Sequence, residues 1–161
     1  MKKLFLILLC LIGFGFTSQA QEISPNALGL RFGGGNGYGA EFSYQRHLGG
    51  SNRLELDLGF RSESDFNSFK ITGLYQWVWN IEGGFNWYAG VGAGIGSVND
   101  RRSDDKGDGA FALLAGDIGV EYVFDVPIQV FVDFRPEIVL ASYDVYRSFG
   151  PDFAIGVRFR W

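Results

Sequence analysis

Apolar and polar residues alternate over several stretches of the chain, most clearly at its C-terminal end. From Phe153 to Trp161 every second residue is apolar, and the residues between them are small or cationic. A period of two is typical of a β-strand with one apolar and one polar face. The pattern continues to the last residue, although chain ends fray unless neighbours hold them. We therefore expect a partner on both sides of this strand, as in a closed barrel.

The same alternation predicts seven further strands. They cover about Ala27–Gly33, Tyr38–Leu48, Arg53–Phe60, Phe69–Trp79, Phe85–Gly96, Ala110–Phe124 and Ile128–Ile138. Eight strands make an all-β fold, and we expect a single antiparallel up-and-down barrel.

The connections between these strands alternate in length. Short turns are expected at Gly49–Asn52, Asn80–Gly84 and Asp125–Pro127, and longer polar loops at Arg61–Ser68, Ser97–Gly109 and Val139–Gly150. Barrels that cross the bacterial outer membrane have short periplasmic turns and longer outer loops. The short first loop, Gly34–Gly37, departs from this rule. Pro136 falls inside a strand, where it cannot donate a ladder hydrogen bond, so we expect a bulge there, near the outer rim.

Alternation alone does not say which face points outward, because a soluble lipocalin-like barrel has the same pattern with its apolar face inside. Large aromatic residues, however, gather where the apolar faces approach the short turns or the C-terminus. They are Trp77, Trp79, Phe85, Trp87, Tyr122, Phe124, Phe159 and Trp161. Tyr38, Phe60, Phe69 and Phe149 would mark the opposite end. Two aromatic belts are typical of a transmembrane barrel, so the apolar face is expected to point outward.

The opposite, polar faces carry charges of both signs. The cations are Arg31, Arg53, Lys70, Arg135, Arg158 and Arg160, and the anions are Glu41, Glu55, Asp57, Asp117, Glu121, Asp133 and Glu137. A barrel of eight strands is barely wide enough for its own side chains, and buried charges need partners. The two signs are nearly balanced, so we expect a closed lumen filled by salt bridges. Gly90, Gly92, Gly94 and Gly119 are expected to make room for the long charged side chains.

The N-terminus has the layout of a secretory signal. A cationic start, Met1–Lys3, precedes the apolar run Leu4–Phe16, and small residues follow up to Ala20. The run is too short to span a membrane comfortably. We expect residues 1–20 to be a cleaved signal peptide and residues 21–161 to form the barrel domain. Cys10 lies in that apolar run, and Leu8 and Leu9 before it disfavour lipid attachment, so the mature chain would contain no thiol.

Taken together, the signal, the strand number, the aromatic belts and the Phe159–Trp161 ending resemble the small OmpA/OmpX-like eight-stranded outer-membrane barrels. The resemblance is to the version common as the outer membrane protein beta-barrel domain of Bacteroidota, and it covers nearly the whole mature chain. It implies residence in the outer membrane, contact with outer-membrane lipid and lipopolysaccharide, and insertion machinery that reads the C-terminal strand. It brings no catalytic motif, cofactor or metal, and we expect a monomer.

A lipid-A-modifying enzyme is the main catalytic alternative, and His47, the only histidine, is its candidate base. It ends a strand that runs toward the periplasmic side, away from lipid A, and no serine follows at the expected spacing. We instead expect His47 to lie at the lumen rim, hydrogen-bonded to its neighbours. Asp117 and Glu121 share one strand face and could form a catalytic carboxylate pair, but they are expected to pair with arginines.

Two loop-like segments also suggest ligand sites. Asp100–Gly109 is rich in aspartate, but Lys106 and Ala115 stand where an EF-hand loop that starts at Asp104 needs oxygen ligands. We expect a solvated outer loop, in which Arg101 and Arg102 could bind phosphates weakly. The glycines of Gly33–Gly39 and Gly90–Gly96 precede no helix, so they do not indicate a nucleotide site.

Composition narrows the function further. The net charge of −4 and the lack of a basic stripe exclude nucleic acid as an expected partner. We expect a non-enzymatic outer-membrane barrel whose outer loops serve envelope structure, adhesion or ligand contact. The alternatives are a narrow channel for small solutes, the lipid-A-modifying enzyme, and a soluble periplasmic binding barrel.

Overall fold

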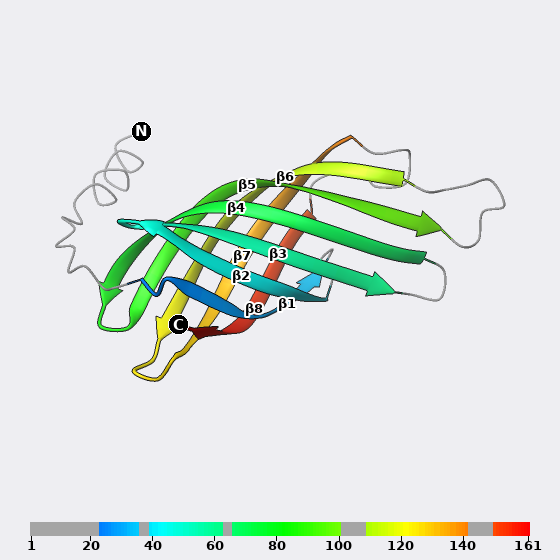
Figure 1. The fold of residues 1–161 in the computed structure, drawn as a ribbon. Coiled ribbons are helices and arrows are strands. Elements are labelled where there is room, and N and C mark those ends of the chain that lie inside the picture. Colours follow the sequence, from blue (N-terminus) through cyan, green and yellow to red (C-terminus); the bar gives the residue numbers. More distant parts are fainter. Residues whose placement is uncertain (1–22, 36–38, 63–65, 101–108, 142–149) are drawn as a thin grey trace, which may run out of the picture.

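The computed structural model describes residues 23–35, 39–62, 66–100, 109–141 and 150–161. Eight strands form one closed antiparallel barrel in which each strand pairs with its neighbours in sequence (Figure 1). The strands are β1 (Asn26–Gly35), β2 (Ala40–Gly49), β3 (Asn52–Ser62), β4 (Phe66–Glu82), β5 (Phe85–Asp100), β6 (Gly109–Val123), β7 (Ile128–Ala141) and β8 (Gly150–Arg160). The predicted up-and-down barrel of eight strands is thus confirmed. In the described part of the chain, no helix has the length and apolarity needed to span a membrane.

The two ends of the chain close the barrel against each other. β8 pairs with β1 over nine residue pairs, from Ala27 opposite Arg160 to Gly35 opposite Asp152. Beyond the last pair, the backbone N–H of Asn26 donates to the carbonyl of Trp161, and the N–H of Trp161 donates back to Asn26. The C-terminal strand therefore has the two partners that its alternation predicted.

The strands are longer than the apolar alternation predicted, chiefly at the end that carries the longer loops. β3 and β4 remain paired out to Ser62 opposite Asn67, and β4 and β5 out to Phe66 opposite Asp100. The expected loops at Arg61–Ser68 and Ser97–Gly109 are shorter for this reason. Backbone ladders need no apolar side chain, so a sequence pattern based on hydrophobicity misses polar strand ends.

Pro136 does not lie at a bulge, contrary to our expectation. It stands opposite Pro151 of β8, while β6 and β7 keep one register from Ala115 opposite Glu137 to Ile118 opposite Phe134. On the β6 side Pro136 packs against Gly116, where a side chain would crowd the proline ring. The register shift of this ladder occurs further along, between Ala112 and Leu113.

Residues of each strand alternate between the outer wall and the lumen. The large apolar side chains lie on the outer wall and remain exposed, as for Val91 (57%), Ile118 (50%) and Phe153 (63%). The buried side chains face the lumen and are mostly polar or charged. The distribution is therefore the reverse of that in a water-soluble protein, in which large apolar side chains fill the interior.

Candidate functional site in the barrel lumen

The lumen contains a set of charged side chains that we call the lumen cluster. Its buried members are Arg31, Glu41, Arg53, Glu55, Asp57, Lys70, Asp117, Glu121, Asp133, Arg135, Asp152 and Arg158. Counting described side chains alone, every strand except β5 contributes at least one of them. The alternation of each strand turns these residues inward, and closure of the barrel brings residues that are far apart in sequence within hydrogen-bond distance.

Arg31 of β1 joins three strands through its guanidinium group. Its Nε and Nη2 donate to Asp133 of β7, with the shortest distance 2.6 Å. Its Nη1 lies 2.9 Å from Glu41 of β2 and 2.7 Å from Asp152 of β8. The bidentate, charge-assisted pair with Asp133 fixes the orientation of both side chains in addition to its electrostatic attraction.

Arg135 of β7 lies among four carboxyl groups. Its Nη2 is 2.8 Å from Asp57 and 3.1 Å from Glu55, both on β3. Its Nη1 is 3.4 Å from Glu41, and its Nε is 4.0 Å from Asp117 of β6. Arg135 thus makes ionic contacts with residues of three other strands.

Arg158 of β8 is the second cation beside Glu55. Its Nη2 lies 2.9 Å from Glu55 Oε1, and its Nε donates to Ser43. Its guanidinium carbon lies 3.6 Å from the centre of the Phe131 ring, which is a cation–π arrangement.

Arg53 and Lys70 mark the two ends of the cluster. Near the short turns, Arg53 Nη1 donates to Glu121 at 2.7 Å, and its Nε donates to Gln76 at 2.6 Å. Toward the loops, Lys70 Nζ lies 3.1 Å from Glu41 and 2.7 Å from the partly exposed Glu137. The ionic contacts therefore run along much of the lumen.

Neutral amides connect the charged groups. Gln76 donates to both Glu55 and Asp117, while Gln45 donates to Glu55 at 2.6 Å and accepts from Gln129. These bonds supply donors to carboxylate oxygens that the cations do not reach. Breaking one of them would leave a buried acceptor without a donor, which is costly.

Part of the lumen is apolar, which the sequence analysis did not identify. Leu74 of β4 packs with Phe111, Leu113 and Ala115 of β6, and Val139 of β7 lies against them. Tyr88 and Phe131 are also buried. The alternation along each strand could have revealed these residues, because each lies on the same strand face as residues that were predicted to point inward.

The glycines of the lumen accommodate these apolar and aromatic groups rather than the arginines alone. A side chain at Gly119 would collide with Tyr88, and one at Gly156 would collide with Phe131. A side chain at Gly96 would likewise collide with Phe111. Of the four glycines expected to make room for long charged side chains, Gly119 lies against Tyr88 and Gly90 against Gln76. Gly92 lies against the backbone of Gly73, and Gly94 against Thr72 and Leu113, so the groups nearest these glycines are uncharged.

One predicted cation lies outside the buried cluster, and one acid that was not predicted lies inside it. Arg160 lies at the short-turn rim, where it binds Ser24 and the carbonyls of Phe124 and Val126. Asp152, which the sequence analysis omitted, is buried against Arg31. The buried set is therefore more acidic than the near balance that we expected.

The other candidate residues fall in varied places. His47 Nε2 lies 3.0 Å from the carbonyl oxygen of Gly50, as expected for a rim histidine bonded to its neighbours. Glu121 pairs with Arg53, whereas Asp117 bonds to Gln76 and lies farther from Arg135. Gly90–Gly96 belongs to β5, and most of Asp100–Gly109, including Arg101 and Arg102, lies outside the described residues. Among the described residues, no group of three or more His, Cys, Asp or Glu side chains is arranged to hold a metal ion.

The outer wall carries the aromatic belt predicted at the short-turn end. The rings of Trp79 and Trp87 stack at 4.3 Å, and Tyr122 contacts both Phe85 and Phe124 within 5 Å. At the other end Phe60 and Phe69 lie 5.6 Å apart. Tyr38 and Phe149, assigned to that second belt, lie outside the described residues.

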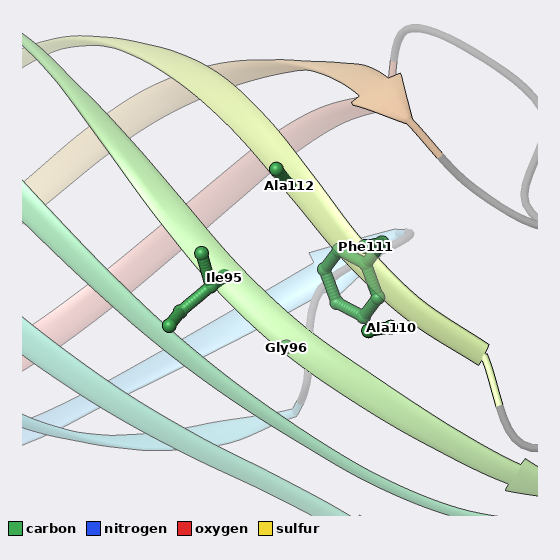
Figure 2. Close-up of a pocket in the computed structure, with 5 residues that line it drawn as sticks. All are labelled: Ile95, Gly96, Ala110, Phe111 and Ala112. Carbon is green, nitrogen blue, oxygen red and sulfur yellow. The ribbon is translucent and has the colours of Figure 1, made fainter.

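A shallow hollow of about 400 Å³ lies between β5 and β6 (Figure 2). Ile95, Gly96, Ala110, Phe111 and Ala112 line it. None of these side chains can act as an acid, a base, a nucleophile or a metal ligand, so the hollow offers no chemistry of its own.

Comparison with known proteins places the chain in a class by fold. No family model matches the sequence, and no curated protein matches it either. The structure resembles solved eight-stranded barrels, so the chain is a small antiparallel β-barrel of that class.

Three solved structures illustrate the resemblance. The N-terminal β-barrel domain of Pseudomonas aeruginosa OprF aligns with a TM-score of 0.66 at 14% identity, over 86% of this chain and 100% of that chain. Neisserial surface protein A (NspA) aligns with a TM-score of 0.62 at 12% identity, over 84% and 94%. Ail, the attachment invasion locus protein of Yersinia pestis, aligns with a TM-score of 0.59 at 14% identity, over 86% and 97%.

Proposed function

We propose that this chain is a non-enzymatic integral outer-membrane barrel with a closed lumen, and that its outer loops contact the surroundings of the cell. The observation that carries this proposal is the reversed distribution of side chains. Val91, Ile118 and Phe153 are exposed on the outer wall, while Arg31, Arg135 and Arg158 are fully buried. Exposed apolar surface of this extent is unfavourable in water and favourable in lipid.

The aromatic belt supports the orientation in the membrane. Tryptophan and tyrosine prefer the boundary between lipid and water, and Trp77, Trp79, Trp87 and Trp161 all lie toward the short-turn end of the outer wall. The short turns would then face the periplasm and the longer loops the outside. A signal peptide cleaved near Ala20 would export the chain, and the insertion machinery would read the Phe159–Trp161 ending.

The lumen cluster supports closure. Five buried cations interlock with carboxyl groups from opposite strands, and an apolar group around Leu74 and Leu113 fills space on the β4–β6 side. Opening a continuous water path would require several of these buried ion pairs to separate, which is costly. The proposed barrel is therefore a rigid support for its loops rather than a pore.

The names of two similar proteins support a role at the cell surface. One is called a surface protein and another an attachment invasion locus protein. We propose that the loops after β5 and β7 serve adhesion, ligand contact or envelope structure, as the resemblance to the barrels of Bacteroidota implies. Outer-membrane lipid and lipopolysaccharide would surround a monomeric barrel.

Two measurements test this function. In membrane fractionation, the protein should be in the outer membrane and should migrate differently on gels before and after boiling, because small barrels stay folded in cold detergent. In planar lipid bilayers, the purified barrel should give no steady single-channel current. Recovery in the soluble periplasm would refute the membrane assignment, a steady conductance would establish the narrow channel instead, and a changed acyl pattern of lipid A in mass spectrometry would establish the enzyme.

A further inference from the structure

The buried part of the lumen cluster contains more acids than bases. Among the side chains that the structure describes, five buried cations face seven buried carboxyl groups. An uncompensated charge in a low-dielectric interior is strongly unfavourable, and a carboxyl group can remove its charge by binding a proton. The excess of two therefore raises the question of which two carboxyl groups carry protons.

Hydrogen bonding separates the seven carboxyl groups into two sets. Five of them accept a hydrogen bond from a cation: Glu41 and Asp133 from Arg31, Asp152 also from Arg31, Glu55 from Arg135, and Glu121 from Arg53. The other two, Asp57 and Asp117, accept none from a cation. The number of carboxyl groups without such a bond equals the excess of negative charge.

The surroundings of Asp57 are crowded with other acids. Its Oδ2 lies 2.8 Å from Arg135 Nη2, but neither of its oxygens accepts a hydrogen bond. Arg135 is shared with Glu55 and Glu41, which also act on Asp57, while Arg158 is the other cation facing it. Glu41 also contacts Arg31 and Lys70, and Glu55 also contacts Arg158, whereas among the described residues Asp57 has an ion pair with Arg135 alone.

Asp117 also lies beside Arg135 and has no hydrogen bond to it. One of its oxygens accepts from the neutral amide of Gln76, and the other has no hydrogen-bond partner. Arg135 Nε, at 4.0 Å, is the cation beside it, and Glu55 and Asp133 act on it as further acids. The hydroxyl group of Tyr88, which also faces Asp117, is buried without a hydrogen-bond partner.

We propose that Asp57 and Asp117 form a proton-binding pair, each holding one proton in the folded barrel. The two protons bring the buried cluster to neutrality and turn a carboxylate oxygen of each residue into a donor. The inference rests on the proposed closed lumen, because open access of water and salt would screen the excess charge.

Bound protons make folding dependent on pH. The unfolded chain would release both protons near neutral pH, so the folded state binds more protons than the unfolded state. Stability then falls as pH rises, by a factor of about ten in the folding constant per pH unit for each proton. The wild-type barrel is expected to lose stability as the pH rises above about 4, the ordinary pKa of an aspartate, with a slope that approaches two protons between about pH 5 and pH 7 and that disappears once the folded barrel itself releases the protons.

Infrared spectroscopy of the folded full-length mature chain in phosphatidylcholine vesicles tests the protons directly. We expect the native barrel to show the carbonyl band of protonated carboxyl groups at pH 7, and Asp57→Asn and Asp117→Asn each to reduce it. Asp125→Asn is the control, because Asp125 is exposed in the short turn between β6 and β7 and lies outside the lumen cluster. That control is expected to leave both the band and the stability unchanged.

Unfolding by urea at pH 5 and pH 7 supplies the second readout. Asp57→Asn or Asp117→Asn should reduce the pH slope by one proton and raise the urea midpoint at pH 7, and the double variant should lose the slope. A wild-type spectrum without the protonated band, or a wild-type midpoint independent of pH, would overturn the proposal. These wild-type outcomes decide it even if a variant fails to fold.

The tests also separate protons from other neutralising ions and from failure of the closed barrel. If sodium or calcium ions raised the midpoint while the protonated band was absent, a metal cation would be the counter-charge and the proton pair would be refuted. A steady conductance in planar bilayers would refute the closed lumen by itself. A closed barrel without the infrared band would leave the proposed function standing and remove only the proton pair.

Discussion

At the scale of single residues, Arg135 is the central cation of the lumen. It contacts Glu41, Glu55 and Asp57 within 3.4 Å and is fully buried. Its removal would leave several buried carboxyl groups without their nearest cation, and such a loss costs more than the pair contributes when it is intact.

The variant Arg135→Met keeps the volume of the side chain and removes its charge. We expect it to lower the free energy of unfolding by about 3–5 kcal/mol, the range for breaking a buried ion pair. Urea unfolding in lipid vesicles measures the loss. Arg46→Gln is the matched control, because Arg46 is exposed and its side chain donates to Asn26 at the barrel rim, and it should cost about 1 kcal/mol or less. Equal losses in both variants would contradict the central role of Arg135.

Gly156 faces the lumen, and there the packing of uncharged groups, not charge, limits which residue fits. A side chain there would collide with the ring of Phe131, which itself packs on Arg158. We expect Gly156→Val to destabilise the barrel by about 1–3 kcal/mol through overpacking.

The partner change Phe131→Leu should recover part of the loss in the Gly156 variant, since it removes atoms from the collision. Gly73→Ala is the control, because its new methyl group would meet only Leu56 at an ordinary distance of 3.4 Å. If the two glycine variants lost equal stability, overpacking against Phe131 would not be the cause.

At the scale of secondary structure elements, β5 has one face on the outer wall and the other in the lumen. Its outward residues include Trp87, Val91 and Ile95, while Asn86, Tyr88 and several glycines face the lumen. A shift of its register by one residue would exchange the two faces. The long ladders of β5 with β4 and β6 therefore fix the orientation as well as the fold.

The outer face of β5 allows a test of the membrane orientation. Val91→Arg places a charge on the middle of the outer wall, and we expect it to lower the stability in vesicles by about 2–4 kcal/mol. Ile81→Arg, near the short turn after β4, should cost only about 0–1 kcal/mol because the charge can reach the interface. Equal tolerance of both substitutions would indicate that water, not lipid, surrounds the wall.

At the scale of the whole molecule, the barrel depends on contact between the two ends of the chain. Trp161 and Asn26 exchange backbone hydrogen bonds of 3.0 and 3.1 Å, and Phe159 stands between Leu28 and Ile128 in the neighbouring strands. Closure leaves no strand edge unpaired in the wall, which is the requirement for a sheet in lipid.

Removal of residues 159–161 tests closure and the proposed insertion signal together. We expect the truncated chain to yield a lower folded fraction, seen as the heat-modifiable gel band, both in cells and in refolding from urea into vesicles. Trp161→Ala keeps the length of the chain and separates the two effects. It should refold in vitro nearly as the wild type does and reach the outer membrane poorly in cells, if insertion machinery reads the terminal aromatic residue.

The class of fold and the direction of most side chains could be predicted from the sequence. Period-two alternation, as in Phe153–Trp161, depends only on local strand geometry, so all eight strands were identified. The first residues of β4 and the last residues of β5 were missed because most of them are polar and show no clear alternation. The bulge expected at Pro136 was wrong: the β6–β7 register is unchanged across it, and Gly116 on β6 leaves room for the proline ring.

The candidate site was predictable only as a collection of residues. Parity placed Arg31, Glu55 and Arg135 on the inner face, yet it could not pair them, because their partners come from strands up to about 120 residues away, as for Arg31 and Asp152. Alternation also could not predict that Arg160 lies at the rim and that Asp152 is buried. Burial depends on how high each residue lies along the barrel axis, and the register of the ladders sets that height.

The sequence by itself determined that this chain forms eight two-faced strands with aromatic residues gathered near one end, since such a pattern follows from backbone geometry and hydrophobicity. The tertiary structure alone decided which acids meet which bases, and that Asp57 and Asp117 receive no hydrogen bond from the cations whose side chains are described. The physical reason is that ionic contacts require distances near 3 Å, and only closure of the barrel, with one register for every ladder, sets those distances.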